Sequence, residues 1–325
     1  MDAGIKGFGF YIPEKRVNAN KVAKKAGMHE KVIQYIGCDT ISEAEENEFP
    51  SDMAVKASKE AIENAQIDPL QIDLMINCPA GLQDYIIPPI SGKIQYEIGA
   101  KNAYCFDIVQ GCCGMMTGLH IAKNYILAND VNNILLVSSD KWSAFTDNHC
   151  AEAVIFGDGA GAIIVSNIFE NFKIIDFIFK TEGKFFNLYG INEGGVKNLQ
   201  VKNGIKYECL DVETARGDFK EIYMPSFIEV IKKLLNKNRL KISDISYISM
   251  VNANLKLLEI ISSQLNFPIE RTSADYLKKW GHVGGFDIFF NIYLAKKDGK
   301  IKKGDKIILL NAGIGFTWGA CLIEF

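Results

Sequence analysis

The sequence predicts an α/β fold made of two similar halves that pack into a layered structure. Three observations support this prediction: short β-branched runs alternate with amphipathic helical patterns, the order of these elements repeats once along the chain, and the composition is that of a globular protein. Hydrophobic residues make up 48% and charged residues 23% of the 325 residues, so the chain can bury a large core.

The predicted strands are short apolar runs bounded by polar or glycine-rich turns. They are DLMINC (73–78), AYCFDIV (103–109), NILLVSSD (133–140), GAIIVS (161–166), YISMV (247–251), KIILLNA (306–312) and ACLIEF (320–325). Between them lie helical patterns such as SDMAVKASKEAIENAQ (51–66), where apolar residues recur three and four positions apart and Ser51 can cap the first turn. This alternation predicts that helices cover buried sheets.

Two pairs of segments form a weak internal repeat. IDPLQIDLMINC (67–78) is similar to LKISDISYISMVNAN (240–254), and NNILLVSSD followed by GDGAGAIIVS is similar to GDKIILLNAG followed by FTWGACLIEF. Each pair places a helix exit and an acidic turn before a buried strand. We therefore expect one half at residues 1–167 and the other at residues 168–325, related by a pseudo-twofold axis.

Charge and cysteine patterns argue against several classes of protein. The net charge is -3 and no basic block is interleaved with aromatic residues, so we expect no binding to nucleic acid. No apolar run is long enough to cross a membrane, and the start MDAGIKGFGFYIPE has no signal-peptide pattern, so a cytoplasmic location is expected. The eight cysteines form no CxxC pair, so no metal site is expected.

Two adjacent cysteines lie where a predicted strand gives way to a predicted helix. Gly111, Cys112, Cys113 and Gly114 follow the run AYCFDIV, and apolar residues then recur at helical spacing to Leu127. The helix dipole and free backbone N–H groups at such a turn stabilise a thiolate, which makes a cysteine nucleophilic. The alternative is a packed pair of small residues, and the segment by itself leaves both open.

The stretch KKWGHVGGFDIFFNIYLAKK (278–297) places His282 in a glycine loop and Asp287 at the start of an apolar helix. As structural residues, Asp287 would cap the helix and His282 would be an ordinary loop residue. As functional residues, the imidazole would take a proton and the carboxylate would hold it in one tautomer, as in acyl-transfer triads. Two glycine-rich stretches, FGDGAGA (156–162) and NAGIGFTWG (311–319), can form tight turns or donate N–H groups to an oxyanion.

Six segments of the chain match one set of family patterns in the same order. The patterns GxGxYxPE, TSDMAxxAxxxAL, DLIIxxT, FDxxAACxGF, GDGAGA and GxGxTWGA are matched by GFGFYIPEKRV (7–17), PSDMAVKASKEAI (50–62), DLMINC (73–78), FDIVQGCCGM (106–115), GDGAGA (157–162) and GIGFTWGA (313–320). Over nearly its whole length the chain therefore resembles β-ketoacyl-ACP synthase III, of the thiolase superfamily. The resemblance implies a thiolase-like αβαβα fold and a homodimer. It also implies a transferase of fatty acid or secondary metabolite biosynthesis that uses acyl-ACP or acyl-CoA and binds no permanent cofactor.

The resemblance further implies roles for single residues. Aligning FDIVQGCCGM on FDxxAACxGF places the family's nucleophile on Cys112 rather than Cys113, and the family's two oxyanion N–H groups fall on Cys112 and Ile314. The family's HQAN histidine is replaced by Val251 in VNAN, and its GNxSAAS asparagine by His282 in GHVGGFD. Val251 cannot donate a hydrogen bond, and loss of one such donor typically slows a reaction by about a hundredfold to a thousandfold.

The sequence GHxGxxD resembles a branch of synthase III relatives in antibiotic pathways, in which a nucleophile, this histidine and this aspartate form a triad. This likeness implies that Cys112, His282 and Asp287 are catalytic: an acyl-Cys112 thioester forms, and its acyl group passes to a hydroxyl, amine or carbon acceptor. Two alternatives stay open. One is a true β-ketoacyl-ACP synthase III that condenses with malonyl-ACP, and the other is a catalytically weak partner subunit of an active homologue.

The donor side departs from the family pattern as well. Where members that use acyl-CoA have WxxxRTG, this chain has KVIQYIGC (31–38), with Lys31 and Tyr35 in place of the tryptophan and arginine that hold adenine. We therefore expect acyl carrier protein to be the donor and partner, docked in part by Lys256. By analogy with the family, a substrate tunnel is expected to involve Leu82, Tyr85, Ile86, Ile87 and Pro88.

Overall fold

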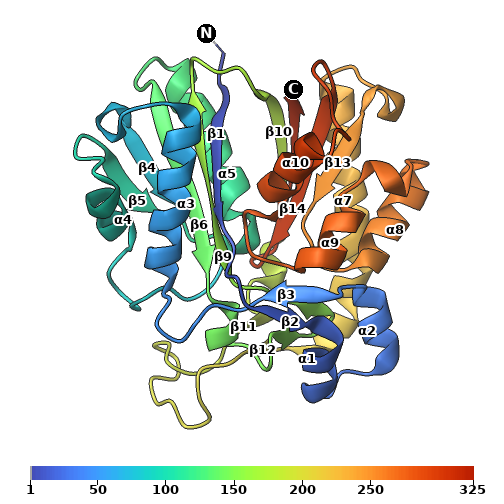
Figure 1. Ribbon diagram of the computed structural model, residues 1–325. Coiled ribbons are helices and arrows are strands. Elements are labelled where there is room, and N and C mark those ends of the chain that lie inside the picture. The colour runs from blue at the N-terminus through green and yellow to red at the C-terminus, as the bar shows by residue number, and fades with distance from the viewer. Residues whose placement is uncertain (1) are drawn as a thin grey trace.

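The computed structural model describes residues 2–325 and is built around a nine-stranded mixed sheet (Figure 1). The strand order is β13-β14-β15-β10-β1-β9-β6-β4-β5. The strands are β1 (Gly4–Tyr11), β4 (Leu74–Asn77), β5 (Tyr104–Asp107), β6 (Asn133–Asp140), β9 (Gly159–Ser166), β10 (Lys173–Thr181), β13 (Tyr247–Met250), β14 (Lys306–Gly313) and β15 (Thr317–Glu324). Each of the seven runs predicted from the sequence overlaps one of these strands.

The sheet has two parts that meet at one residue pair. β1 and β10 pair only through Gly4 and Lys173. On one side of this junction β5, β4 and β6 run parallel, whereas β6, β9 and β1 are antiparallel. On the other side β13 and β14 run parallel, whereas β14, β15 and β10 are antiparallel. The same pairing pattern thus occurs on both sides of the junction, and the division of the chain at residues 167 and 168 stays a prediction.

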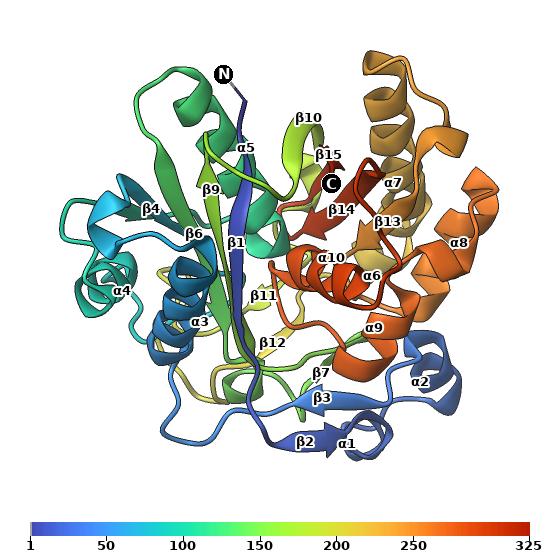
Figure 2. The ribbon, with the colours of Figure 1, turned by 45° about the horizontal axis from the view of Figure 1, so that its top comes forward.

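Helices cover both faces of each part of the sheet (Figures 1 and 2). The main helices are α3 (Pro50–Ala65), α4 (Ser91–Ile98), α5 (Gly114–Leu127), α7 (Asp218–Lys237), α8 (Leu255–Leu265) and α10 (Asp287–Lys297). α3 and α4 pack on the outer face of the part that contains β1, and α7, with α8 beside it, packs on the outer face of the other part. α5 and α10 lie between the two parts. This is the layered αβαβα arrangement that the sequence predicted.

The buried strands place apolar side chains on both faces. In β6, Ile134 and Leu136 belong to the central cluster with α5 and α10, whereas Leu135 and Val137 belong to the outer cluster with α3. β14 alternates in the same way between the central cluster and the cluster around α7 and α8. Because each face is covered by helices, the strands appear in the sequence as unbroken apolar runs rather than as alternating patterns.

The remaining α-helices and strands are shorter. They are β2 (Arg16–Asn18), β3 (Thr40–Ser42), β7 (Cys150–Ala151), β8 (Val154–Ile155), β11 (Tyr189–Ile191), β12 (Tyr207–Cys209), α1 (Ala19–Lys25), α2 (Glu30–Ile36), α6 (Val212–Arg216) and α9 (Ala274–Trp280). Several of them, including β2, β3, α1 and α2, lie at the bottom of Figure 1. Within residues 2–325, no helix is long and apolar enough to span a bilayer.

The start of α3 differs from the prediction in one detail. The helix begins at Pro50 with Phe49 as its N-cap, so Ser51 is not the cap. Proline favours the first helical position because it has no N–H group to leave unpaired. The Ser51 hydroxyl instead donates to Asp84 at 2.5 Å, which ties the helix start to the loop after β4.

Candidate active site

Cys112 lies in a short helical turn, Gly111–Cys113, that leads from β5 into α5. Gly111 has a φ of +51°, and a Cβ atom there would lie 2.9 Å from the nitrogen of Ile314. Glycine therefore allows the turn between β14 and β15 to approach the cysteine closely. The side-chain amide of Asn311, in β14, donates to the carbonyl of Cys112 at 2.8 Å. Strand β14 thus holds the cysteine turn in place.

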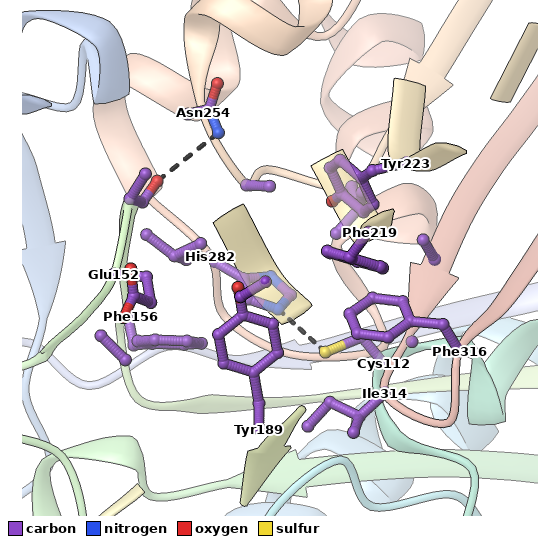
Figure 3. A pocket seen from close by; sticks show the side chains of 18 of the residues that line it. Cys112, Glu152, Phe156, Tyr189, Phe219, Tyr223, Asn254, His282, Ile314 and Phe316 are labelled. Carbon is purple, nitrogen blue, oxygen red and sulfur yellow. Dashed lines mark hydrogen bonds between the residues drawn. The ribbon is translucent and has the colours of Figure 1, made fainter. Parts of the chain in front are cut away.

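The structure brings together the three side chains that the sequence singled out. The Sγ atom of Cys112 lies 3.0 Å from Nε2 of His282 (Figure 3). On the other side of the imidazole, Nδ1 lies 2.5 Å from Oδ2 of Asp287. Since a carboxylate accepts, Nδ1 carries a hydrogen and donates it to Asp287, which leaves Nε2 to exchange a proton with the sulfur.

Asp287 is fixed by backbone groups from two other segments. It is the first residue of α10 and is fully buried. Its Oδ1 atom accepts from the Val283 nitrogen at 2.9 Å, and its Oδ2 atom accepts from the Asn252 nitrogen at 2.8 Å. These bonds fix the direction in which the carboxylate faces His282, and they join the loop after β13 to the glycine loop.

His282 is held by its own backbone and by aromatic rings. Its nitrogen donates to the Ile155 carbonyl at 3.0 Å, and its carbonyl accepts from the Gly157 nitrogen at 2.9 Å. The ring packs against Phe156 and Trp142, with centroid separations of 5.3 and 6.0 Å. The imidazole therefore has little freedom to turn away from Cys112.

The charges around His282 favour its protonated form. Burial by itself lowers the pKa of His282, but the Asp287 carboxylate and then the Cys112 sulfur outweigh burial and raise this pKa well above its ordinary value. An imidazolium next to a cysteine stabilises the thiolate, which is the nucleophilic form of the side chain. The arrangement therefore places an imidazole that binds a proton tightly directly beside the Cys112 sulfur.

Cys112 and His282 lie in the wall of a cavity of about 320 Å³. Val251 and Ile314 line it together with Cys112 and His282. Seven further lining residues are aromatic, as Figure 3 shows in part: Trp142, Phe156, Tyr189, Tyr207, Phe219, Tyr223 and Phe316. A cavity of this kind suits a mainly apolar substrate that reaches the sulfur from outside.

Comparison with known proteins gives the family of this chain. Residues 106–183 match the model of 3-oxoacyl-[acyl-carrier-protein (ACP)] synthase III, and residues 235–325 match the model of its C terminal part. The chain is 31% identical over 323 residues to the β-ketoacyl-[acyl-carrier-protein] synthase III of Ehrlichia canis, an alignment that covers 98% of each protein. The chain belongs to the β-ketoacyl-ACP synthase III family.

Other relatives agree with this assignment. The synthase III of Staphylococcus haemolyticus is 30% identical over 332 residues, which covers 100% of this chain and 99% of that protein. The crystal structure of the synthase III from Aquifex aeolicus VF5 superposes with a TM-score of 0.86 at 27% identity, covering 99% of this chain and all of that one. This synthase III homologue is thus a thiolase-fold member of a transferase family.

In this synthase III homologue a fourth polar residue, Asp140, lies against the glycine loop that carries His282 and was not predicted from the sequence. It is fully buried at the end of β6, and its Oδ1 atom accepts from the nitrogens of Ala80 and Gly81 at 3.1 and 2.7 Å. A Cβ atom on Gly284 would lie 2.4 Å from its Oδ2 atom, so the carboxylate packs directly against the glycine loop. Burial raises the pKa of Asp140 to about 7. Its only sequence signal was a carboxylate at the end of an apolar strand.

The five residues expected to line a tunnel lie elsewhere in this synthase III homologue. Leu82, Tyr85, Ile86, Ile87 and Pro88 are on an exposed loop between β4 and α4 and are not among the residues that line the cavity of their own chain. The analogy placed them from sequence position alone, which does not show the direction that a loop takes. Their contact with substrate stays a prediction.

The remaining predicted residues occupy positions compatible with their expected roles. Ile314 lies in the turn between β14 and β15, next to the Cys112 turn, and the use of its N–H group for an oxyanion stays a prediction. Lys256 is exposed near the start of α8, where its Nζ atom lies 3.1 Å from Glu259. Docking of a carrier protein on Lys256 is likewise a prediction.

Proposed function

We propose that this protein is an acyltransferase that forms an acyl-Cys112 thioester and passes the acyl group to a hydroxyl, amine or carbon acceptor. The observation that carries the proposal is the continuous contact from Cys112 through His282 to Asp287, at 3.0 and 2.5 Å. A thiolate, a base and an orienting carboxylate are the parts that thioester exchange and acyl transfer require.

In the first half of the proposed reaction, the Cys112 thiolate attacks the carbonyl of a donor thioester. The N–H groups of Cys112 and Ile314 stabilise the negative charge on the oxygen, and the donor thiol leaves with the proton that His282 held. In the second half, an acceptor enters the same cavity and loses its proton to His282 as it attacks the acyl carbon. The proton then returns to the Cys112 sulfur as the thioester breaks.

Val251 favours transfer to a heteroatom over condensation with malonyl-ACP. Condensation develops an enolate at a thioester oxygen and depends on donors placed beside it, whereas Val251 is a buried cavity residue with no donor. Transfer to oxygen or nitrogen needs a proton acceptor instead, which His282 and Asp287 supply. Decarboxylative condensation is the second candidate, because relatives that share about 30% of their residues with this chain are named β-ketoacyl-ACP synthases III.

The proposed donor is an acyl carrier protein thioester, with acyl-CoA as the alternative. The names of the relatives specify the carrier protein. In this chain Lys31 and Tyr35 lie on α2 in place of an adenine-binding tryptophan and arginine, and Lys256 is an exposed cation near the cavity residue Asn254. A higher kcat/KM for acyl-ACP than for the matching acyl-CoA, reduced by Lys256→Glu for acyl-ACP alone, is the expected result.

The experiment that tests the proposal has two arms. The first measures release of labelled carbon dioxide from malonyl-ACP by the acyl-enzyme, and the second measures breakdown of the acyl-enzyme by hydroxyl and amine acceptors. We expect slow decarboxylation and acceptor-dependent breakdown that His282→Ala and Asp287→Asn both suppress, by about a thousandfold or more. Rapid decarboxylation to a β-ketoacyl product, with no heteroatom acceptor used, would establish the condensing alternative. Failure of Cys112 to accept any acyl group would indicate a catalytically weak partner subunit.

A further inference from the structure

Three tyrosines from separate elements surround the reactive pair. Tyr189 begins β11, Tyr207 begins β12 and Tyr223 lies in α7, and all three line the cavity that contains Cys112. Figure 3 shows Tyr189 and Tyr223 on opposite sides of the contact between Cys112 and His282. The hairpin pairs Ile191 with Tyr207, so Tyr189 and Tyr207 are diagonal neighbours, and their rings stack with centroids 6.5 Å apart.

The hydroxyl groups of these tyrosines have no partner within residues 2–325. None of the three oxygens takes part in a hydrogen bond, whereas the hydroxyl of Tyr276 donates to Asp298 at 2.9 Å. The oxygens are also not enclosed by protein, in contrast to the hydroxyl of Tyr247, which is buried without a partner. Since the rings line the cavity, the three hydroxyls are left free for a molecule inside it. A polar group withdrawn from bulk water without a partner costs free energy that a ligand can recover.

The three phenols stay protonated at neutral pH. Burial is the main cause that raises the pKa of Tyr207 and of Tyr223, and the Cys112 sulfur adds to it in both cases. Burial likewise raises the pKa of Tyr189. All three phenols line the same cavity as Cys112, so they surround the space that an acyl-Cys112 would share with its acceptor. The cluster therefore offers neutral O–H donors, which can also accept hydrogen bonds, beside the point of transfer.

The rest of the wall restricts which molecule can use these donors. Phe219 and Phe316 present carbon surfaces beside Tyr223, with ring centroids 5.1 and 6.0 Å from the Tyr223 ring. Among the described residues that line the cavity, the only Asp, Glu, Lys or Arg side chains are Glu152 and Lys220. A carboxylate or phosphate at the phenols would lack a cluster of cations, and an alkyl chain would leave the phenols unpaired.

We propose that Tyr189, Tyr207 and Tyr223 form the acceptor subsite, and that the acceptor is a neutral molecule with an apolar face and several hydroxyl groups. This inference rests on the proposed acyl transfer and narrows its acceptor. One acceptor hydroxyl attacks the acyl carbon, so a C–O bond forms and the C–S bond breaks. The hydroxyl proton passes to Nε2 of His282 and then to the Cys112 sulfur, so the products are an ester and the free thiol. The other hydroxyls bond to the phenols.

Binding can be tested separately from transfer with ring compounds that differ only in polar groups. The probes are cyclohexanol, cyclohexane-1,3,5-triol and 4-hydroxycyclohexanecarboxylate, and the readout is how strongly each slows alkylation of Cys112 by iodoacetamide. We expect the triol to protect at the lowest concentration and the carboxylate at the highest. Each of Tyr189→Phe, Tyr207→Phe and Tyr223→Phe should raise the half-protecting triol concentration about threefold to tenfold, and leave that of cyclohexanol unchanged.

Controls keep the outcome interpretable. The changes to phenylalanine preserve shape and remove no hydrogen bond within the protein, and Tyr125→Phe, on the exposed end of α5, should behave as the wild type. Equal protection by cyclohexanol and the triol would overturn the inference. So would a Tyr→Phe change that slows acylation of Cys112 by acyl-pantetheine as much as it weakens triol protection, because the phenols would then bind the donor. If the triol protects as expected but never accepts the acyl group from the acyl-enzyme, the result supports the binding subsite and contradicts the proposed transfer.

Discussion

At the scale of single residues, the adjacent cysteines Cys112 and Cys113 differ because of what surrounds them. Cys112 is 8% exposed and faces His282, whereas Cys113 is fully enclosed beneath the turn. Burial, and after it the charge of Cys112, raises the pKa of Cys113 to about 12. A thiol with such a pKa is almost entirely protonated at neutral pH and does not act as a nucleophile.

We therefore expect acylation on Cys112 alone. After incubation with acyl thioesters, peptide mass spectrometry should find the adduct on Cys112 in the wild type and in Cys113→Ala. Cys112→Ala should carry no adduct at any cysteine under the same conditions. An adduct on Cys113 in the wild type or in Cys112→Ala would contradict the assignment.

Asp140 makes the stability of the protein depend on pH. The pKa of an unfolded aspartate is 3.8, and burial raises the folded value to about 7. The folded state therefore binds this proton more tightly, so its contribution to stability is complete below about pH 4 and is lost as the pH rises through 7. In the variant Asp140→Asn, the amide side chain cannot ionise and can still accept the two backbone bonds through its oxygen.

The quantity to compare is a difference in the free energy of unfolding: the value for the wild type minus the value for Asp140→Asn. Between pH 5 and pH 8 this difference should fall by about 2 to 4 kcal/mol. Denaturant titrations of both proteins across this range measure it. A difference that stays constant with pH would show that Asp140 does not titrate in the folded protein in this range.

The sequence revealed some residues of the site and not others. Cys112, His282 and Asp287 could be singled out because each falls on a position of a family motif, whereas their own segments left a structural role open. Tyr189 and Tyr207 could not, since strands of three residues are too short to show a pattern that tells which way a ring points. Asp140 was hidden because its partners, the backbone of residues 80 and 81 and the glycine loop, are distant in sequence.

At the scale of elements, the glycine loop between α9 and α10 shapes the site. Gly284 has a φ of +110°, and a Cβ atom there would lie 2.4 Å from Asp140. The loop also supplies the Val283 nitrogen that donates to Asp287. Any side chain at Gly284 would therefore disturb both the backbone and the carboxylate beneath it.

Gly284→Ala should lower the free energy of unfolding by about 3 kcal/mol or more and abolish acylation of Cys112. Gly304→Ala is a matched control, because Gly304 has a φ of +92° but nothing within 4 Å of its Cβ position. The control should lose only about 1 kcal/mol and keep its activity. Urea titrations and the acylation assay compare the two variants. Equal losses in both would show that the contact with Asp140 is unimportant.

Long, buried elements could be predicted from the sequence, whereas the shortest ones could not. The long strands were predictable because both of their faces are buried, which leaves continuous apolar runs. The hairpins β7–β8 and β11–β12 were not predicted, since strands of two or three residues are too short to show a period. These hairpins contribute residues that line the cavity. The residues proposed to bind the acceptor were therefore harder to predict from the sequence than the proposed catalytic residues.

At the scale of the whole molecule, one edge of the sheet is left uncovered. β5 is the last strand on its side, and Tyr104 in it is 68% exposed. The loop before α4 adds Ile86 and Ile87, which are 82% and 89% exposed. A strand with one unpaired edge beside exposed apolar residues is typical of a protein interface, which supports the expectation of a homodimer.

Ile87→Asp should weaken self-association, because a carboxylate would be buried in the interface without a partner. Sedimentation equilibrium should show a dimer for the wild type and a shift of at least about tenfold in Kd for the variant. Val196→Asp is a suitable control, since Val196 is 92% exposed on a different loop. A monomeric wild type, or equal effects of the two changes, would contradict the placement of the interface.

The contact between Cys112 and His282 joins positions 170 residues apart in the chain. During synthesis on a ribosome, the cysteine turn emerges roughly 10 to 30 seconds before the glycine loop that activates it. Throughout that interval the thiol has no imidazolium beside it and reacts as an ordinary cysteine. In the proposed reaction, acyl carriers and cellular electrophiles therefore meet an activated Cys112 only after the glycine loop has folded beside it. The contact between Cys112 and His282 thus forms only when both parts of the sheet have folded and docked.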